Sequence, residues 1–357
     1  MRLLVTGGAG FIGSHLVRGL LGDAWPELPD AIVTVLDLFT YCGNPANLAA
    51  VRDTGRLRVV DGDIRDEALL DRIVPGHDAI VHCAAETHVD RSIAGAGVFA
   101  STNVLGTTTL LEAALRHRVG RFVHVSTDEV YGSIDQGSWT PETPLAPNSP
   151  YAASKAGADL VALAYHRTHG LPVVVTRGSN TYGPYQYPEK VVPRFVTNLL
   201  DGRPVPLYGD GGNVRDWMHV DDHAHGLVLA LLRGLAGQVY HLGAGTELTN
   251  RELTARLLAA CGATWDSVRP VPDRPGHDRR YALDTSASLA ELGFVAGTPF
   301  DTGLADTVRW YREHRPWWSG AGSVPATATT DRDTPAPRAG RTPTGLVGDG
   351  PAAGARP

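Results

Sequence analysis

The stretch VTGGAGFIG, residues 5–13, decides the fold of this chain. Three of its glycines, Gly7, Gly10 and Gly13, form the pattern G-x-x-G-x-x-G between an apolar run and a helical pattern. Glycine allows a tight turn, and its missing side chain lets the backbone approach a pyrophosphate. A helix that starts near Phe11 directs its N-terminal amides at the same anion. The stretch therefore predicts a strand–turn–helix unit that binds a dinucleotide, although the spacing differs from the G-x-G-x-x-G fingerprint.

Short β-rich runs and helical patterns alternate along the chain after this unit. Strands are predicted over 3–6, 32–37, 57–61, 79–83, 122–126, 173–177 and 239–242. Helices are predicted over 14–21, 66–74, 104–116, 153–168, 191–201, 222–232 and 250–261. Alternation of this kind predicts an α/β fold, with a Rossmann-type doubly wound parallel sheet covered by helices on both faces.

Composition narrows the class of protein. The chain has 357 residues and a formal net charge of −6, which gives no electrostatic reason to expect nucleic acid or an anionic membrane as partner. Its three cysteines, Cys42, Cys83 and Cys261, are far apart and form no metal or redox motif, so we expect a reducing cytoplasm. No apolar run reaches the roughly 18 residues that a membrane span requires. Residues 319–357 are rich in Ala, Gly, Pro and Thr and are predicted to be a disordered tail.

The end of the second predicted strand favours NAD over NADP. Asp37 stands there, and an acid at this point accepts hydrogen bonds from a ribose diol and repels a 2′-phosphate. The alternative is that Asp37 is only a turn residue. Small residues after the fourth strand would let the cofactor lie close. The cofactor-binding residues expected are Gly7, Gly10, Phe11, Ile12, Gly13, Asp37, Thr40, Asp63, Ile64, Ala84, Ala85, Tyr151 and Lys155.

The predicted strand 122–126 runs into Thr127, Asp128 and Glu129, and Tyr151 and Lys155 follow on a predicted helix. Tyrosine and lysine four residues apart share one helix face. Tyrosine titrates near ~10, and a neighbouring ammonium lowers that pKa. The pair can therefore take a proton from a sugar hydroxyl while a hydride leaves the same carbon. Alone, such a pair is more often a solvated helix face.

These motifs carry a resemblance to a known family over residues 1 to about 318. The chain resembles the extended short-chain dehydrogenases/reductases, and most closely the dTDP-glucose 4,6-dehydratases. The matching stretches are LVTGGAGFIGSH, AAETHVDRS, STDEVYG, SPYAASKAGAD, YGPYQYPEKVVPRF, PLYGDGGNVRDWMHVDDH and DRPGHDRRYALD. The resemblance implies NAD as cofactor, a nucleoside-diphosphate sugar (dTDP-glucose) as substrate, and a homodimer formed through helices 104–116 and 153–168.

The resemblance also implies a division into domains. Residues 1–183 with about 221–245 would form the NAD-binding Rossmann domain. Residues of about 184–220 and 246–318 would form a smaller, discontinuous α/β domain that binds the nucleotide sugar.

The same resemblance assigns roles to the two adjacent acids. Glu129 would remove the C5 proton of the sugar, and a protonated Asp128 would supply the proton with which the C6 hydroxyl leaves as water. Thr127 would hydrogen-bond the C4 hydroxyl or the Tyr151 oxygen. The competing interpretation is a helix N-cap beside a solvated acid.

Residues that would contact the substrate come from several loops, again by resemblance. Arg215 offers a forked donor suited to phosphate oxygens. The full set expected is Glu86, His88, Asn180, Glu189, Lys190, Pro206, Tyr208, Arg215, Asn250, Arg274, His277 and Tyr281.

Three points leave the interpretation open. The histidine-rich stretch 218–225 raises the question of a metal, but its acids also suit a helix N-terminus, and we expect no metal site. Cys42 and Thr181 stand where the family usually has alanine and asparagine, which leaves the nucleotide base and the hexose open. Rival interpretations are a related UDP-sugar dehydratase, decarboxylase or epimerase, and a non-catalytic NAD-binding protein.

Overall fold

The computed structural model describes residues 1–319, all of which belong to one compact unit. Its centre is a seven-stranded sheet in the order β10-β6-β5-β4-β1-β2-β3, in which every neighbouring pair is parallel. The strands are β1 (Arg2–Thr6), β2 (Ile32–Asp37), β3 (Leu57–Asp61), β4 (Ala79–His82), β5 (Arg121–Thr127), β6 (Val173–Gly178) and β10 (Val239–Leu242). The strand order reverses between β1 and β4, and doubly wound sheets bind ligands outside the carboxyl ends of the strands at such a point.

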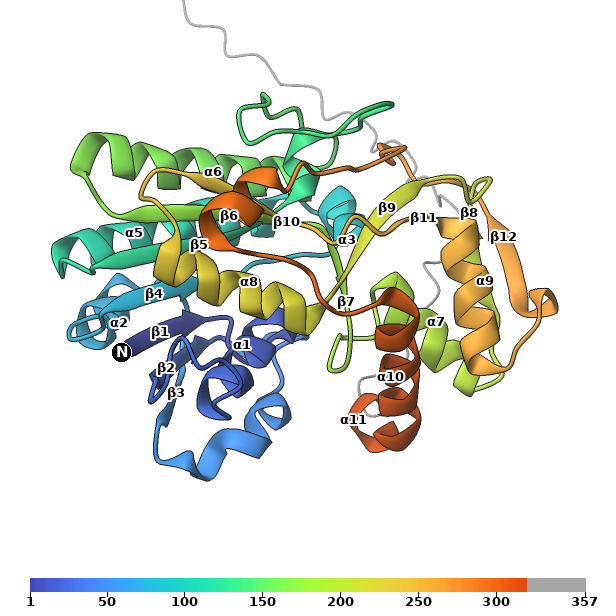
Figure 1. Cartoon of the computed structure of the whole chain (residues 1–357), viewed down its shortest axis with the longest axis horizontal. Coiled ribbons are helices and arrows are strands. Elements are labelled where there is room, and N and C mark those ends of the chain that lie inside the picture. Colours follow the sequence, from blue (N-terminus) through green and yellow to red (C-terminus); the bar gives the residue numbers. More distant parts are fainter. Residues whose placement is uncertain (320–357) are drawn as a thin grey trace, which may run out of the picture. The chain divides into compact units, whose positions relative to one another are not determined.

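Helices cover both faces of this sheet (Figure 1). Helices α1 (Phe11–Leu21) and α8 (Val220–Arg233) lie on one face, and α2 (Glu67–Ile73), α5 (Thr107–Arg116) and α6 (Pro150–His169) lie on the other. Successive residues of β1 show why: Leu3 and Val5 pack into the apolar core beneath α1 and α8, while Leu4 packs into the core beneath α2, α5 and α6. Side chains of a strand alternate between faces, so an uninterrupted apolar strand needs cover on both sides.

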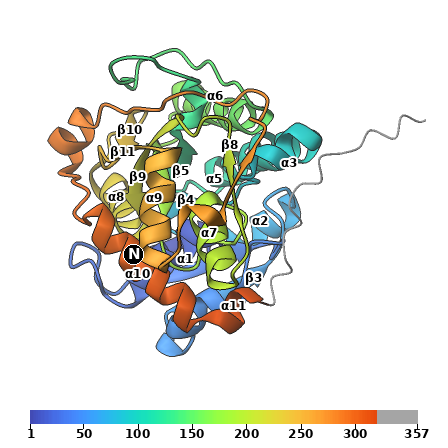
Figure 2. The ribbon, with the colours of Figure 1, turned by 90° about the vertical axis from the view of Figure 1, so that its right-hand side faces the viewer.

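A smaller group of elements lies beside the sheet (Figures 1 and 2). It holds a three-stranded sheet in the order β11-β9-β7 and a two-stranded sheet of β12 and β8. The strands are β7 (Asn180–Tyr182), β8 (Val205–Tyr208), β9 (Val214–His219), β11 (Glu247–Thr249) and β12 (Val268–Val271). The helices are α7 (Val191–Leu200), α9 (Asn250–Cys261), α10 (Phe300–Glu313) and α11 (Arg315–Ser319). These elements share an apolar core of their own.

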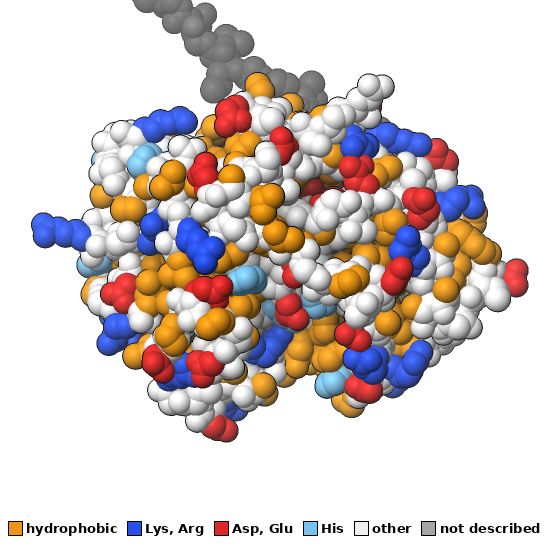
Figure 3. All heavy atoms as spheres, in the orientation of Figure 1, with side chains coloured by type: hydrophobic (Ala, Val, Ile, Leu, Met, Phe, Trp, Pro, Cys, Tyr) orange, Lys and Arg blue, Asp and Glu red, His pale blue; other side chains and the backbone are white. Residues whose placement is uncertain are grey.

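Short helical segments complete the described part of the chain. They are η1 (Pro45–Thr54), α3 (Val89–Ala94), α4 (Gly97–Phe99), η2 (Ala100–Gly106), η3 (Asp128–Tyr131), η4 (Trp265–Ser267) and η5 (Ser288–Leu292). No helix within residues 1–319 is long and apolar enough to cross a membrane. On the face drawn in Figure 3, positive and negative side chains are interspersed.

The predicted fold class is confirmed, and the seven predicted strands are the seven strands of the main sheet. Each strand end lies within one residue of its prediction. Helix α6 begins at Pro150, three residues earlier than predicted, because the Ser149 hydroxyl caps the helix by accepting a hydrogen bond from the Ala152 amide at 3.1 Å. The helix predicted over 104–116 begins as the π-helical η2 before α5. The predicted tail, apart from Ser319, lies outside the described residues.

Candidate active site

A cavity of about 500 Å³ opens at the carboxyl ends of the main sheet. Every site residue predicted from the sequence lines this cavity, with the exception of Lys155. The residues come from the turn after β1, the ends of β2, β4, β5 and β6, and the loops of the smaller group. The structure therefore brings the two predicted sets, for cofactor and for substrate, into one space.

The turn after β1 has room for an anion and little room for side chains. Gly7 has φ +67°, and a Cβ added there would lie 2.6 Å from the backbone nitrogen of Ala84. A Cβ on Gly13 would lie 2.2 Å from the carbonyl oxygen of Gly7. Helix α1 starts after Gly10 with no side-chain cap and no acid in its first turn. Its N-terminal amides are therefore available to a pyrophosphate.

Asp37 is held at the end of β2 by two backbone amides. Its Oδ2 accepts a hydrogen bond from Ala9 and its Oδ1 accepts one from Phe39, both at 2.9 Å. Burial raises the pKa of this carboxyl group, and the two hydrogen bonds oppose that rise. A carboxylate fixed in this way can accept further bonds from the hydroxyls of a ribose.

Asp63 has a partner that the sequence analysis missed. Arg65 contacts both oxygens of its carboxylate at 2.5–3.0 Å, and these hydrogen bonds lower the pKa of Asp63. Arg65 lines the cavity as well. The pair is only two residues apart in the sequence, so the charge pattern alone could have suggested it.

Thr127, at the end of β5, organises the two acids that follow it. Its hydroxyl accepts a hydrogen bond from the Glu129 amide at 3.2 Å and donates one to Asp128 Oδ1 at 3.1 Å. The other oxygen of Asp128, Oδ2, is buried and has no partner among the described residues. A buried, unpaired carboxyl oxygen in a cavity wall is free to bond a ligand.

Asp128 and Glu129 differ in their electrostatic surroundings. Burial and the charge of Glu129 raise the pKa of Asp128 well above its usual range. Burial also raises the pKa of Glu129, but three cations oppose that rise: Arg274, Lys190 and Arg215. Both pKa values are therefore raised, and the neutral form is favoured more strongly at Asp128 than at Glu129.

Tyr151 lies beside these acids, and Lys155 lies one turn further along α6, behind the cavity wall. The Nζ of Lys155 donates to the carbonyl oxygen of Val125 at 2.7 Å, and burial lowers its pKa to about 8. The sequence analysis expected the ammonium to lower the pKa of Tyr151. Instead burial, followed by the charges of Glu129 and Asp128, raises that pKa well above its usual value, with a hydrogen bond to Thr127 opposing.

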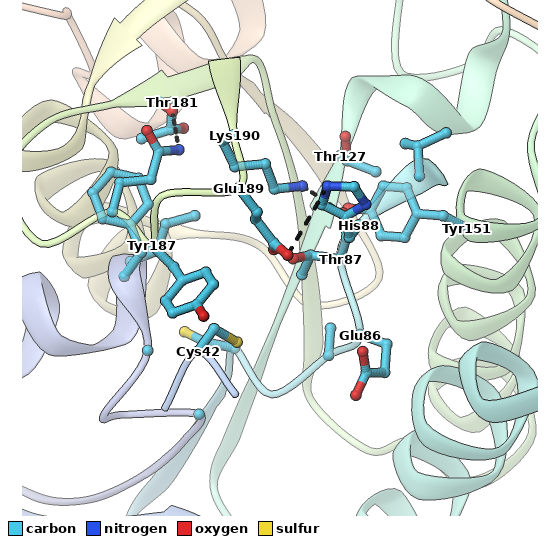
Figure 4. A pocket seen from close by; sticks show the side chains of 18 of the residues that line it. Cys42, Glu86, Thr87, His88, Thr127, Tyr151, Thr181, Tyr187, Glu189 and Lys190 are labelled. Carbon is cyan, nitrogen blue, oxygen red and sulfur yellow. Dashed lines mark hydrogen bonds and ion pairs between the residues drawn. The ribbon is translucent and has the colours of Figure 1, made fainter. Parts of the chain in front are cut away.

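The loop before α7 supplies a compact group of polar side chains (Figure 4). Lys190 Nζ donates to the carbonyl oxygen of Thr87 at 2.5 Å, and Glu189 accepts a bond from the Tyr41 hydroxyl at 2.9 Å. The His88 imidazole lies 4.0 Å from the second Glu189 oxygen. Burial and the Lys190 charge lower the pKa of His88 to about 4, so the ring is neutral near pH 7.

At the far end of the cavity, cations stand near aromatic rings. The guanidinium of Arg215 lies 4.0 Å from the ring centroid of Tyr281, whose hydroxyl donates to Asp278 at 2.6 Å. The Arg274 guanidinium lies 3.6 Å from Asp90. Asn250, Pro206 and Tyr208 line the same end, where Tyr208 lies edge-on to the ring of His277. Two guanidinium groups with adjacent flat walls fit a diphosphate that carries a base.

Comparison with known proteins adds to this geometry. Residues 4–307 match the family model described as GDP-mannose 4,6 dehydratase. A dTDP-glucose 4,6-dehydratase of Streptomyces niveus is 61% identical over 318 residues, which cover 89% of this chain and 95% of that protein. The crystal structure of the dTDP-glucose 4,6-dehydratase DesIV from Streptomyces venezuelae, with NAD and TYD bound, superposes with a TM-score of 0.89. It is 65% identical, and the match covers 90% of this chain and 100% of that one.

The chain belongs to the dTDP-glucose 4,6-dehydratase family.

The same fold serves other chemistry. A UDP-glucose 4-epimerase from Thermotoga maritima has a TM-score of 0.81 at 31% identity, covering 88% of this chain and 99% of that chain. Fold alone therefore does not separate a dehydratase from an epimerase. Asp128 and Glu129 both line this cavity, and the proposal below assigns them the roles of acid and base.

Several residues that line the cavity of this dehydratase were not predicted. Arg194 lies one helical turn after Lys190, so helical spacing could have indicated it. His223 was considered only as a metal ligand, yet it contacts the Thr181 hydroxyl at 2.8 Å. The remaining unpredicted lining residues include Cys42, Arg65, Thr87, Gln186 and Tyr187.

The histidine-rich stretch disperses in the structure. His219 lies 3.6 Å from Asp221, His223 contacts Thr181, and His225 stacks on Trp25. Within residues 1–319, no group of three or more His, Cys, Asp or Glu side chains could hold a metal ion.

Proposed function

We propose that this dehydratase converts dTDP-glucose into dTDP-4-keto-6-deoxyglucose with NAD as a cofactor that is regenerated in each cycle. The observation that carries the proposal is the meeting of Asp128, Glu129 and Tyr151 in one cavity, where the pKa of Asp128 is raised well above its usual range and three cations oppose the rise in the pKa of Glu129. The relatives named above support the substrate, and the structures of relatives with NAD support the cofactor.

The residues around the turn after β1 suit NAD. The N-terminal amides of α1 would hold the pyrophosphate, and Asp37 would accept hydrogen bonds from the adenosine ribose. Lys155, behind the wall, would support the nicotinamide end of the cofactor together with Tyr151. When bound, NAD accepts a hydride from C4 of the sugar and returns it to C6.

Tyr151 would take the proton of the C4 hydroxyl, with Thr127 holding either that hydroxyl or the tyrosine oxygen. The raised pKa of Tyr151 opposes this step, and the positive charge of an oxidised nicotinamide nearby would favour the phenolate. The oxidation leaves a ketone at C4, which acidifies the proton on C5.

Removal of water then uses both acids. Glu129 would take the C5 proton, and Asp128 would give its proton to the departing C6 hydroxyl. The electron pair of the broken C5–H bond forms the C5–C6 double bond as the C6–O bond breaks. Glu129 would return a proton, after exchange with solvent, to C5 when C6 receives the hydride, which restores Glu129. Tyr151 has then gained one proton and Asp128 has lost one, so one proton must pass from Tyr151 to Asp128 through solvent before the next cycle.

The rest of the cavity would bind the nucleotide sugar. Lys190 and Asn180 would contact the hexose, and Arg215 and Arg274 would bind the diphosphate, with His277 and Asn250 beside them. Pro206 and Tyr208 would form a wall for the base. Glu86, His88, Glu189 and Tyr281 complete the predicted substrate set.

We also propose a homodimer in the cytoplasm. Leu105 of η2 and Leu160 of α6 are both more than half exposed, and they lie on the segments through which the resemblance implies pairing. The three cysteines are free, which suits a reducing compartment.

The test is to incubate the purified protein and NAD with dTDP-glucose and to identify the sugar product by NMR. A 4-keto-6-deoxy sugar is expected. Appearance of dTDP-galactose would instead establish an epimerase, and binding of NAD without turnover would establish a non-catalytic protein. Parallel reactions with UDP-glucose would separate recognition of the thymine base from recognition of the diphosphate sugar.

A further inference from the structure

The glycine-rich turn is held from outside by a chain of hydrogen bonds that starts at Ala9. This residue is fully buried, and its amide donates to Asp37 at 2.9 Å. Its carbonyl oxygen accepts from the Asn44 amide at 3.1 Å and from Asn47 Nδ2 at 2.9 Å. The backbone amide and carbonyl group of Ala9 are thus both fixed by residues that lie outside the turn.

Asn47 links this turn to the other end of the described chain. Its Oδ1 accepts a hydrogen bond from the indole nitrogen of Trp317 at 2.9 Å, across 270 positions of sequence. An indole N–H can only donate and a carbonyl oxygen can only accept, so the two partners fix the orientation of the Asn47 amide. The Asn47 carbonyl also accepts from Arg18 of helix α1 at 2.7 Å. Asn47 is 1% exposed, and all of its polar groups are used.

Trp317 belongs to α11, and its side chain packs into a group of aromatic rings. Its ring lies 5.9 Å from that of Tyr185 and 5.1 Å from that of Trp310. Arg18 covers the Tyr185 ring at 4.0 Å, so the same helix α1 contacts both Asn47 and this group. Tyr185 precedes the cavity-lining residues Gln186 and Tyr187. Helix α11 therefore contacts Asn47, which bonds the cofactor turn, and Tyr185, which lies in the loop before α7.

We propose that the hydrogen bond between Asn47 and Trp317 is a positioning contact that retains NAD between turnovers. The proposal rests on the proposed function, in which NAD ends each cycle unchanged and has no need to leave. In this proposal, release of the dinucleotide involves loosening of the turn around Ala9. The bridge opposes that movement because, in the closed turn, loss of the Trp317 donor leaves a buried Asn47 oxygen without a partner.

The test compares two tryptophan variants. Trp317→Phe removes the N–H that reaches Asn47 and keeps most of the ring. Trp318→Phe is the matched control, because the Trp318 indole donates at 2.7 Å to the Tyr311 carbonyl, within the C-terminal segment. The readout is the rate at which bound NAD exchanges with labelled NAD, measured without substrate.

We expect Trp317→Phe to release NAD about five- to tenfold faster than the parent, as loss of one buried hydrogen bond implies. Trp318→Phe should stay within about twofold of the parent by the same reasoning. Asn47→Leu, which removes both side-chain bonds, should release NAD at least as fast as Trp317→Phe. At saturating NAD, the kcat of Trp317→Phe should match that of the parent, while its KM for NAD rises.

Equal exchange rates in the parent and Trp317→Phe would overturn the bridge, as would the same acceleration in both tryptophan variants. A parent that binds no NAD would overturn the proposed function together with the bridge. A parent that binds NAD and turns over dTDP-glucose, with all variants releasing NAD alike, would overturn the bridge alone.

Discussion

Asp128 and Glu129 are neighbours in the chain, yet their surroundings raise their pKa values to different extents. Asp128 faces burial and a neighbouring negative charge, with the Arg215 charge and a Thr127 hydrogen bond only partly opposing them, whereas Glu129 has three cations nearby. An acid and a base that must move protons at adjacent carbons need this difference at the same pH. The sequence could supply the two carboxylates, their place after β5 and the three cations as expected substrate contacts. It could not show that these cations, which arrive from loops far along the chain, act on Glu129.

Glu129→Gln should abolish exchange of the C5 proton with solvent, because an amide of similar shape has no basic oxygen to take that proton. A general base contributes typically ~10²–10⁴-fold to such a step, so overall turnover should fall by about that factor. The measurement is deuterium incorporation at C5 from heavy water, followed by NMR. Incorporation at the parent's rate would show that another group is the base.

Asp128→Asn should slow the loss of water more than the oxidation at C4. The raised pKa of Asp128 favours its protonated form, and an amide cannot donate an acidic proton. Reduced nicotinamide should therefore build up during a single turnover, which its absorbance reports. A variant that shows slow turnover without this build-up would count against the acid role, and Glu129→Gln provides the comparison, because it blocks the same elimination at the C5 proton.

At the scale of secondary-structure elements, periodicity predicted the seven strands of the main sheet because each is a continuous apolar run between turns. The strands of the smaller group were missed because they are short and depend on distant partners. Strand β8 (Val205–Tyr208) pairs with β12 (Val268–Val271), and neither has a pattern of its own. Helix α10 (Phe300–Glu313) was also missed, although Phe300, Leu304 and Val308 recur at helical spacing and could have predicted it.

The turn after β1 offers a test of an element rather than of a catalytic group. Gly7→Ala should weaken NAD binding by at least about tenfold, since the added methyl group would meet the Ala84 backbone at 2.6 Å and displace the turn. Gly55→Ala is the matched control, because Gly55 has φ +71° and open space around its added Cβ. Both variants should lose about 1 kcal/mol of unfolding free energy through their positive φ. Titration calorimetry with NAD separates them, and equal NAD affinities would refute the steric argument.

At the scale of the whole molecule, the site depends on contacts between distant parts of the chain. The motifs placed the cofactor turn, the acidic couple and the Tyr151–Lys155 pair at the ends of parallel strands, and the structure gathers all of them around one cavity except Lys155, which lies behind its wall. Contacts such as that between Asn47 and Trp317 leave no trace in local pattern, because each residue alone resembles a loop or core residue. The proposed association of two copies of the chain would depend on exposed apolar side chains.

Leu160→Glu should convert the proposed homodimer into a monomer. The Leu160 side chain is 57% exposed on α6, and burying a leucine contributes about 1.5–3 kcal/mol, an amount that a two-fold interface counts twice. A buried glutamate would remove that gain and add a desolvation cost, so the dimer should weaken by two or more orders of magnitude, roughly. Leu235→Glu is the control, because Leu235 is equally exposed but lies in the segment between α8 and β10, outside the two helices through which pairing is expected. Light scattering after gel filtration gives the mass of each variant. A dimeric Leu160→Glu variant would place the interface elsewhere, and a monomeric parent would refute the dimer.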